Sequence, residues 1–151
     1  AAATLSRTYK ALATGQVGEH RFSVATTLGN LPFVGMILDA MPGARVLDCR
    51  RERHDLTQRI YFKRYVTGNE YAYALEDIRA FVSQYESIMA HWAERHPGRV
   101  LQVCFEDLVR HPARSLEGIR RFCGIDDRAP PGVEMDETEI GCGKPYLQHL
   151  S

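Results

Sequence analysis

The sequence has no excess charge of either sign, because 19 lysines and arginines balance 19 aspartates and glutamates. Without a net field the protein as a whole does not attract nucleic acid, so any anion-binding site must be local. No apolar run approaches the roughly 20 residues of a membrane span, and no secretory signal opens the chain. We therefore expect a soluble, cytoplasmic protein that binds neither nucleic acid nor a membrane.

The cysteines do not form a recognisable framework either. None belongs to a CxxC pair or lies at metal-ligand spacing from histidines. The four positions are Cys49, Cys104, Cys123 and Cys142. This pattern predicts neither a zinc site nor disulfides, so we expect no metal and buried, reduced thiols.

The chain has the composition of an ordinary globular domain, since 44% of its 151 residues are hydrophobic and 25% are charged. We expect one domain over residues 1–151. Periodicity and end signals predict helices over 1–14, 30–41, 55–64, 73–96 and 112–123. Short apolar runs predict strands over 20–26, 45–49 and 99–105, and residues 126–151 predict a loop with a short turn. This alternation indicates an α/β fold of three layers, a mostly parallel sheet flanked by helices.

The most informative stretch is 44–65, where a short apolar strand runs into an arginine cluster and then into a basic helix. In an open parallel sheet, ligands collect at the carboxyl ends of the strands, where the next helix offers free N–H groups. Arg50, Arg51 and Arg53 leave the predicted strand at this edge. A phosphate or sulfate group is the natural partner of such a cluster.

Two further cations follow on the predicted helix. Arg59 and Lys63 lie four residues apart, so they share a helix face and could reach one anion together. The alternative is that Glu52 and Asp55 neutralise part of the cluster and the other arginines form a solvated helix face.

Two other groups of residues are candidates for a catalytic role. His91 lies beside Trp92 on the longest predicted helix, and we interpret it as a partly exposed helix residue rather than a base. Glu106 and Asp107 follow a predicted strand, but neighbours on a turn point apart. We therefore favour a helix-capping or arginine-pairing role for these two carboxylates.

Four motifs carry a family resemblance: LPFVGMI (31–37), RRERHDL (50–56), MAHW (89–92) and FEDLV (105–109). Their order and spacing resemble the bacterial sulfotransferases, which are often fused to tetratricopeptide repeats, and more distantly the protein-tyrosine sulfotransferases. The resemblance covers about residues 30–125, the C-terminal two thirds of the chain.

This resemblance implies a doubly wound, P-loop-NTPase-like fold. It also implies transfer of a sulfuryl group from 3′-phosphoadenosine 5′-phosphosulfate to an acceptor hydroxyl or amine, without a metal. The family arginine that grips the 3′-phosphate of this nucleotide, or of the product adenosine 3′,5′-bisphosphate, falls on Arg51. The acceptor is not indicated, and no partner besides acceptor and sulfonucleotide is implied.

The chain also departs from the family pattern at the nucleotide site. Arg59 stands where the family has a serine, which would add a bulkier cation to the phosphate site. Arg53 replaces a usual proline, and Phe105 replaces a tyrosine and so lacks its hydroxyl. Near the C-terminus, Lys144 is the one cation that could take the role of the family's closing basic stretch.

The first strand and the glycine-rich phosphate loop of the family have no counterpart in the sequence. Gly15 to Gly18 lacks both a preceding strand and cations, and the family's Asp-Lys pair falls on Ala25 and Thr26. The catalytic base is therefore unassigned. Two alternatives stay open beside the enzyme: a non-catalytic domain that forms a homodimer through its exposed sheet edge, and a part of a longer enzyme.

Overall fold

A computed structural model describes residues 4, 7, 22–125 and 135–141 of the chain. In chain order the helices (α), 3-10 helices (η) and strands (β) are η1 (Leu28–Phe33), α2 (Val34–Ala40), β1 (Val46–Arg50), α3 (Arg53–Phe62), η2 (Glu70–Tyr73), α4 (Leu75–Arg95), β2 (Val100–Cys104), α5 (Phe105–Arg110), α6 (Pro112–Cys123) and η3 (Glu137–Glu139). The predicted helix over 1–14 lies almost entirely outside the described residues, and the predicted turn near the C-terminus lies wholly outside them.

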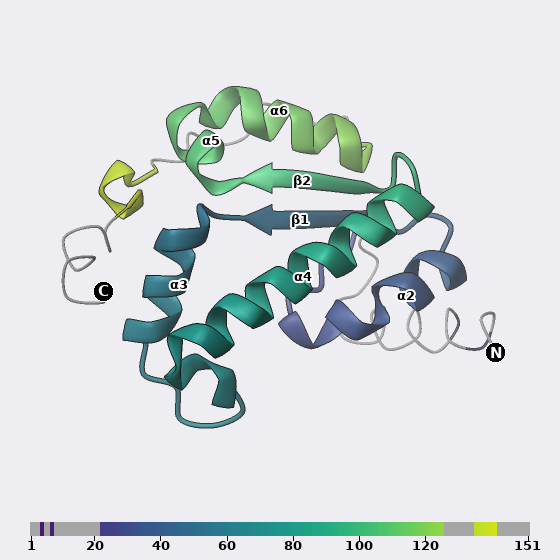
Figure 1. Ribbon diagram of the computed structural model, residues 1–151. Coiled ribbons are helices and arrows are strands. Elements are labelled where there is room, and N and C mark those ends of the chain that lie inside the picture. Colours follow the sequence, from purple (N-terminus) through teal and green to yellow (C-terminus); the bar gives the residue numbers. More distant parts are fainter. Residues whose placement is uncertain (1–3, 5–6, 8–21, 126–134, 142–151) are drawn as a thin grey trace.

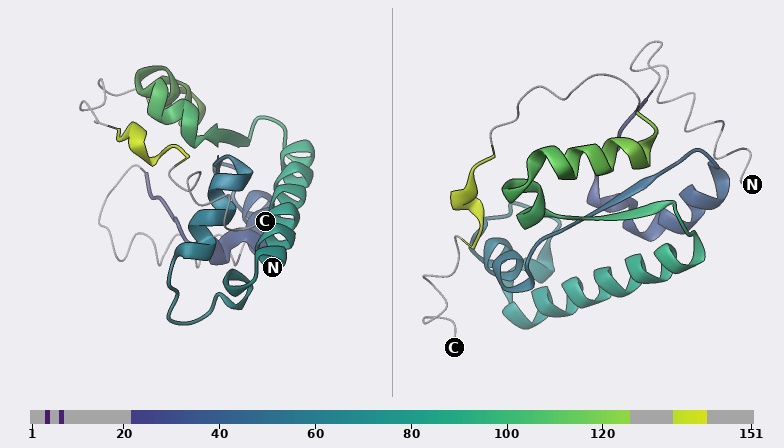
Figure 2. Two further views of the ribbon diagram at one scale, coloured as in Figure 1. Left: turned by 60° about the vertical axis from the view of Figure 1, so that its left-hand side comes forward. Right: turned by 90° about the horizontal axis from the view of Figure 1, so that it is seen from above.

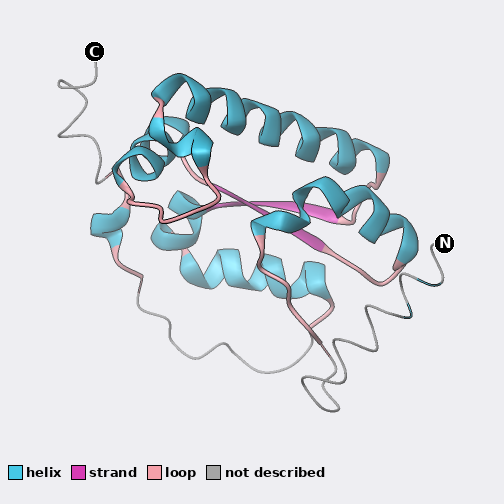
Figure 3. Ribbon diagram, turned by 90° about the horizontal axis from the view of Figure 1, so that it is seen from below, coloured by secondary structure: helices cyan, strands magenta, loops and turns pink. Residues whose placement is uncertain are grey.

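The two strands pair in parallel, with Val46 opposite Val100 and Arg50 opposite Cys104. Helix α4 lies on one side of this pair and α6 on the other, which gives three layers (Figures 1 and 3). The α/β fold class is thus confirmed, with a small parallel sheet flanked by helices. Both carboxyl ends point to the same edge, where α3 and α5 begin (Figure 1).

The core lies between α2, α4 and the sheet. Its buried members are Val34, Leu38 and Met89, and Trp92 packs against them. At Gly35 the two helices approach so closely that an added Cβ atom would lie 2.0 Å from the Trp92 ring. The apolar stripe predicted on the long helix is therefore what holds α2 in place.

An arginine fixes the amino end of the sheet. Arg99, one residue before β2, donates to the carbonyls of Leu38 at 2.7 Å, Met41 at 2.6 Å and Ala44 at 3.0 Å. The last carbonyls of a helix have no hydrogen-bond partner within the helix, and the Arg99 guanidinium supplies donors at the end of α2. Because it also binds the carbonyls of the following residues, it orients the chain that enters β1.

The strand predicted over residues 20–26 is wrong where the structure describes it. Residues 22–27 have no regular structure, and Phe22 and Val24 are exposed. Alternating apolar residues form a strand only where a sheet covers one face, and none does so here. The described sheet therefore has two strands rather than three.

Two smaller expectations also need correction. Cys49 is exposed rather than buried, and Cys104 and Cys123 are half-buried; all three are free thiols. Helix α5 was missed, because its sequence continues directly from β2 without a turn signal.

None of the described helices combines the length and apolar composition that crossing a membrane requires.

Candidate anion-binding site

The turn between β1 and α3 is built by carboxylates. Glu52 caps α3, accepting hydrogen bonds from the backbone N–H groups of His54 at 3.0 Å and Asp55 at 2.8 Å. Its own N–H donates to the carboxylate of Glu106, in the first turn of α5, at 3.0 Å. The turns after the two strands are therefore tied together, which gives this edge of the sheet a defined shape.

Glu106 accepts this hydrogen bond from the Glu52 N–H in its ionised, carboxylate form. Burial by itself would raise the pKa of Glu106, but hydrogen bonds from the Cys104 thiol and the Glu52 N–H outweigh burial, so the pKa of Glu106 is lowered. The hydrogen bond to Glu106 also raises the pKa of the Cys104 thiol, which stays protonated and acts as the hydrogen-bond donor. Glu106 thus accepts from the residue that caps α3, whereas the side chains of Glu106 and Asp107 show neither the helix cap nor the arginine ion pair expected of them among the described residues.

Arg51 leaves this turn with its guanidinium well enclosed. It donates through Nε to Asp55, one helical turn later, and through its terminal nitrogen to the backbone carbonyl of Glu139. Its carbon Cζ lies 4.1 Å above the centre of the Phe105 ring. The side chain of Arg51 is only 13% exposed and that of Asp55 only 2%. A phenyl face thus supports the guanidinium at the position where the family tyrosine was expected.

Arg59, four residues after Asp55 on α3, also contacts Glu139. It forms an ion pair with the carboxylate of Glu139 and lies 3.4 Å from the carbonyl of that residue. The side chains of Arg59 and Glu139 are 33% and 47% exposed, so this pair is open to solvent. The structure therefore brings Arg51 and Arg59 together on one acceptor residue.

That acceptor belongs to η3, far away in the sequence. The short yellow segment lies beside the carboxyl ends of the strands in Figure 1 and again in the right-hand view of Figure 2. Sequence reasoning missed Glu139, because contacts over 80 and 88 residues leave no periodic signal. The one available hint was charge complementarity between an acidic segment, 136–139, and the basic helix.

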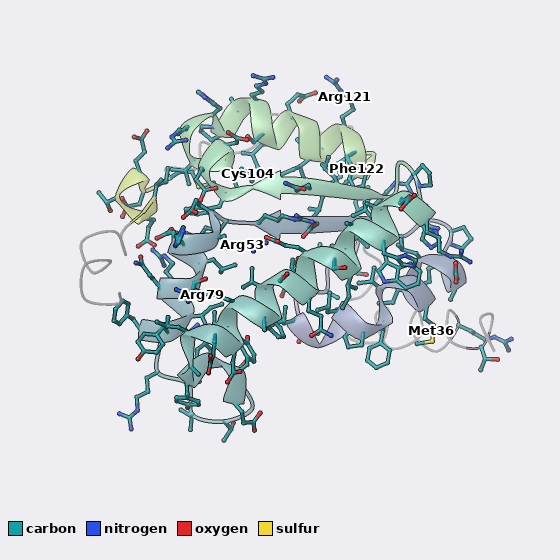
Figure 4. The ribbon with its side chains drawn as sticks, in the orientation of Figure 1. Met36, Arg53, Arg79, Cys104, Arg121 and Phe122 are labelled. Atoms are coloured by element: carbon teal, nitrogen blue, oxygen red, sulfur yellow. The ribbon has the colours of Figure 1, made fainter. Side chains whose placement is uncertain are left out.

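The other arginines of the cluster are paired as well. Arg50 donates to Asp48 at 2.8 Å, and Asp48 also accepts the Tyr85 hydroxyl at 2.6 Å. Arg53 pairs with Glu86 of α4, on the side of α3 that faces this helix (Figure 4). The alternative of internal neutralisation is therefore correct for Asp55 but not for Glu52, which serves as a helix cap.

Lys63 and Arg59 both line a hollow of about 570 Å³ at the C-terminal part of α3. The hollow is bordered by Leu56, Arg59, Ile60, Phe62, Lys63 and Tyr65. The Lys63 ammonium lies 5.4 Å from the centre of the Tyr65 ring. The prediction that Arg59 and Lys63 share a helix face is wrong, because α3 ends at Phe62 and Lys63 follows it with an extended backbone. The two residues share only the lining of this hollow, and Lys144 lies outside the described residues.

The remaining candidates do not join this site. His91 is exposed, as expected for a helix residue, and its ring packs edge-on against that of Trp92, with 4.8 Å between the two ring centres. Among the described residues, no group of three or more histidine, cysteine, aspartate or glutamate side chains could hold a metal ion.

A parallel α/β unit with two arginines converging after a strand is typical of proteins that bind anionic ligands at the strand ends. Comparison with known protein families matches residues 1–129 to the Sulfotransferase family. The chain belongs to this family, and the match extends to the first residue, further than the motifs alone indicated.

A curated relative, an uncharacterized protein of Aquifex aeolicus (strain VF5), is 25% identical over 110 residues. The aligned region covers 71% of this chain but 14% of the relative, so the match spans about a seventh of that longer protein. No solved structure matches the chain significantly.

Proposed function

We propose that the chain takes part in transfer of a sulfuryl group from 3′-phosphoadenosine 5′-phosphosulfate to an acceptor hydroxyl or amine. The observation that carries this proposal is the convergence of Arg51 and Arg59 at the carboxyl end of β1, in a chain of the sulfotransferase family. We also propose that the chain is most similar to the sulfotransferases associated with tetratricopeptide repeats, and that it works in the cytoplasm.

In this proposal Arg51 and Arg59 hold the 3′-phosphate of the nucleotide. A guanidinium offers planar two-point contacts to a phosphate, and the stacked, enclosed Arg51 is fixed in orientation before the ligand arrives. Holding the nucleotide by its 3′-phosphate positions it for in-line displacement at sulfur. The acceptor oxygen or nitrogen forms the new bond to sulfur on one side, while the bond from sulfur to the 5′-phosphate oxygen breaks on the other and adenosine 3′,5′-bisphosphate leaves. Lys144 would add a third cation. No described residue is assigned as the catalytic base.

Isothermal titration calorimetry with adenosine 3′,5′-bisphosphate tests the nucleotide site. We expect saturable binding by the wild type and its loss in Arg51→Ala. Because that variant leaves the buried Asp55 carboxylate without this partner, Arg51→Lys is the second variant. It keeps the charge but loses the two-point contact, so binding should weaken at least about tenfold. No heat from the folded wild type at millimolar nucleotide contradicts the proposal.

A second candidate is a non-catalytic domain that forms a homodimer through its sheet. The supporting observation is that each described strand has one strand neighbour, and that Leu47 of β1 is 38% exposed. An open strand edge with a partly exposed apolar side chain beside it favours strand pairing. Light scattering coupled to size-exclusion chromatography decides this candidate, because a monomer at micromolar concentration excludes it.

A further inference from the structure

Glu139 lies where an anionic ligand of the two arginines would bind. Its carboxylate pairs with Arg59, and its carbonyl accepts from Arg51. Asp55 pairs with Arg51 in turn, so the two cations face two paired carboxylates, and the charge of Arg51 also interacts with the Glu106 carboxylate. A phosphate dianion that approaches this cluster meets little attraction unless one of the carboxylates leaves.

The two carboxylates are not equally able to leave. Asp55 is 2% exposed and lies within α3, whereas the Glu139 side chain is 47% exposed on a 3-10 helix of three residues. This short turn is held by Asp136, which accepts from the Thr138 N–H at 2.9 Å and the Thr138 hydroxyl at 2.6 Å. A half-exposed ion pair is weak because water screens it, so Glu139 is the exchangeable partner.

We propose that Glu139 is a built-in competitor for the nucleotide phosphate. Its carboxylate occupies Arg59 when no ligand is bound, and a phosphate monoester displaces it when the ligand enters. This inference rests on the proposed function and adds regulation to the same site, because whatever moves η3 sets the affinity for the nucleotide. Removing the charge of Glu139 should therefore tighten binding of the phosphate.

The test compares Glu139→Gln with Glu137→Gln in calorimetric titrations with adenosine 3′,5′-bisphosphate and, separately, with inorganic phosphate. Glu137 is a matched control, because it lies in the same turn, is exposed, and its side chain forms no hydrogen bond or ion pair with the described residues, while its backbone carbonyl accepts from the Ile140 N–H in both proteins. We expect Glu139→Gln to bind about fivefold tighter, which corresponds to about 1 kcal/mol. Glu137→Gln should match the wild type, and the gain should vanish when Arg59→Gln is added.

The outcomes separate the inference from the proposed function. If the wild type binds the nucleotide and Glu139→Gln binds it equally well or more weakly, Glu139 is no competitor, while the nucleotide site stands. If the gain appears with inorganic phosphate alone, the competitor stands and the nucleotide assignment fails. If no variant binds either anion, both are overturned.

Discussion

The two ends of the sheet both use arginines, but in different ways. At the amino end, Arg99 donates to three backbone carbonyls near the end of α2. At the carboxyl end, Arg51 and Arg59 share Glu139, a residue from a distant segment whose side chain is half exposed. The carbonyls near Arg99 have fixed places in the fold, whereas a solvent-exposed carboxylate can be exchanged for another anion. The amino end is therefore structural and the carboxyl end is suited to binding.

The largest effect should come from Arg99. Arg99→Ala leaves the carbonyls of Leu38 and Ala44 without their guanidinium donor, so the free energy of unfolding should fall by about 3 kcal/mol in urea titrations. Arg99→Lys should recover part of this loss, since an ammonium reaches fewer of the carbonyls at once. If Arg99→Ala lowers the free energy of unfolding no more than Arg59→Gln does, the two ends of the sheet do not differ as described.

Gly35 tests how tightly the structural end is packed. Gly35→Ala places a methyl group on the Trp92 ring, and forcing α2 away from α4 should cost about 2 kcal/mol of unfolding free energy. The control is Gly118→Ala in α6, where an added Cβ atom meets nothing within 4 Å. There the better helix propensity of alanine should stabilise the protein by about 0.5–1 kcal/mol. Equal effects at both positions would show that α2 and α4 are not in close contact.

Glu106 should make the stability of the carboxyl end of the sheet depend on pH. Because its pKa is lowered in the folded protein, its contribution is complete above the unfolded value of about 4.3 and is lost as the pH falls through the folded value. Glu106→Gln should therefore reduce the loss of stability measured by urea titration between about pH 5 and pH 3. At neutral pH, Glu106→Ala should cost about 1–2 kcal/mol, since the Glu52 N–H loses its acceptor. An unchanged pH profile for Glu106→Gln would show that another carboxylate dominates acid unfolding.

Arg59 should have the smallest effect on stability. Arg59→Gln removes a half-exposed ion pair, so the free energy of unfolding should change by less than about 1 kcal/mol. Thermal unfolding in parallel with nucleotide titration provides the check, because this variant should lose affinity for adenosine 3′,5′-bisphosphate while it keeps its fold. A large destabilisation would place Arg59 in the same structural class as Arg99.

Periodicity and end signals predicted most of the fold. The helices predicted over 73–96 and 112–123 are present as α4 and α6, and Gly124, the residue after α6, has the left-handed φ of 67° typical of a helix end. The strand at 20–26 was wrong because alternation alone does not supply a sheet to pack against. Helix α5 was missed because no turn residue separates it from β2.

The candidate site was predictable only in its local half. Arg51 and Arg59 lie in one strand–turn–helix segment, so spacing and family resemblance were enough to single them out. Glu139 and the bond from the Glu52 N–H to Glu106 depend on long-range packing, which no local pattern encodes. The assignments of Arg51, Arg59 and Lys144 to the nucleotide stay predictions.

The most direct measurement compares adenosine 3′,5′-bisphosphate with adenosine 5′-monophosphate in calorimetric titrations of the wild type and Arg51→Lys. The two nucleotides differ in the 3′-phosphate that Arg51 and Arg59 are proposed to hold. We predict that the wild type prefers the bisphosphate by at least about tenfold, or about 1.4 kcal/mol, and that Arg51→Lys loses most of this preference. Equal affinity of the wild type for the two nucleotides would contradict the assignment of this end of the sheet to the 3′-phosphate.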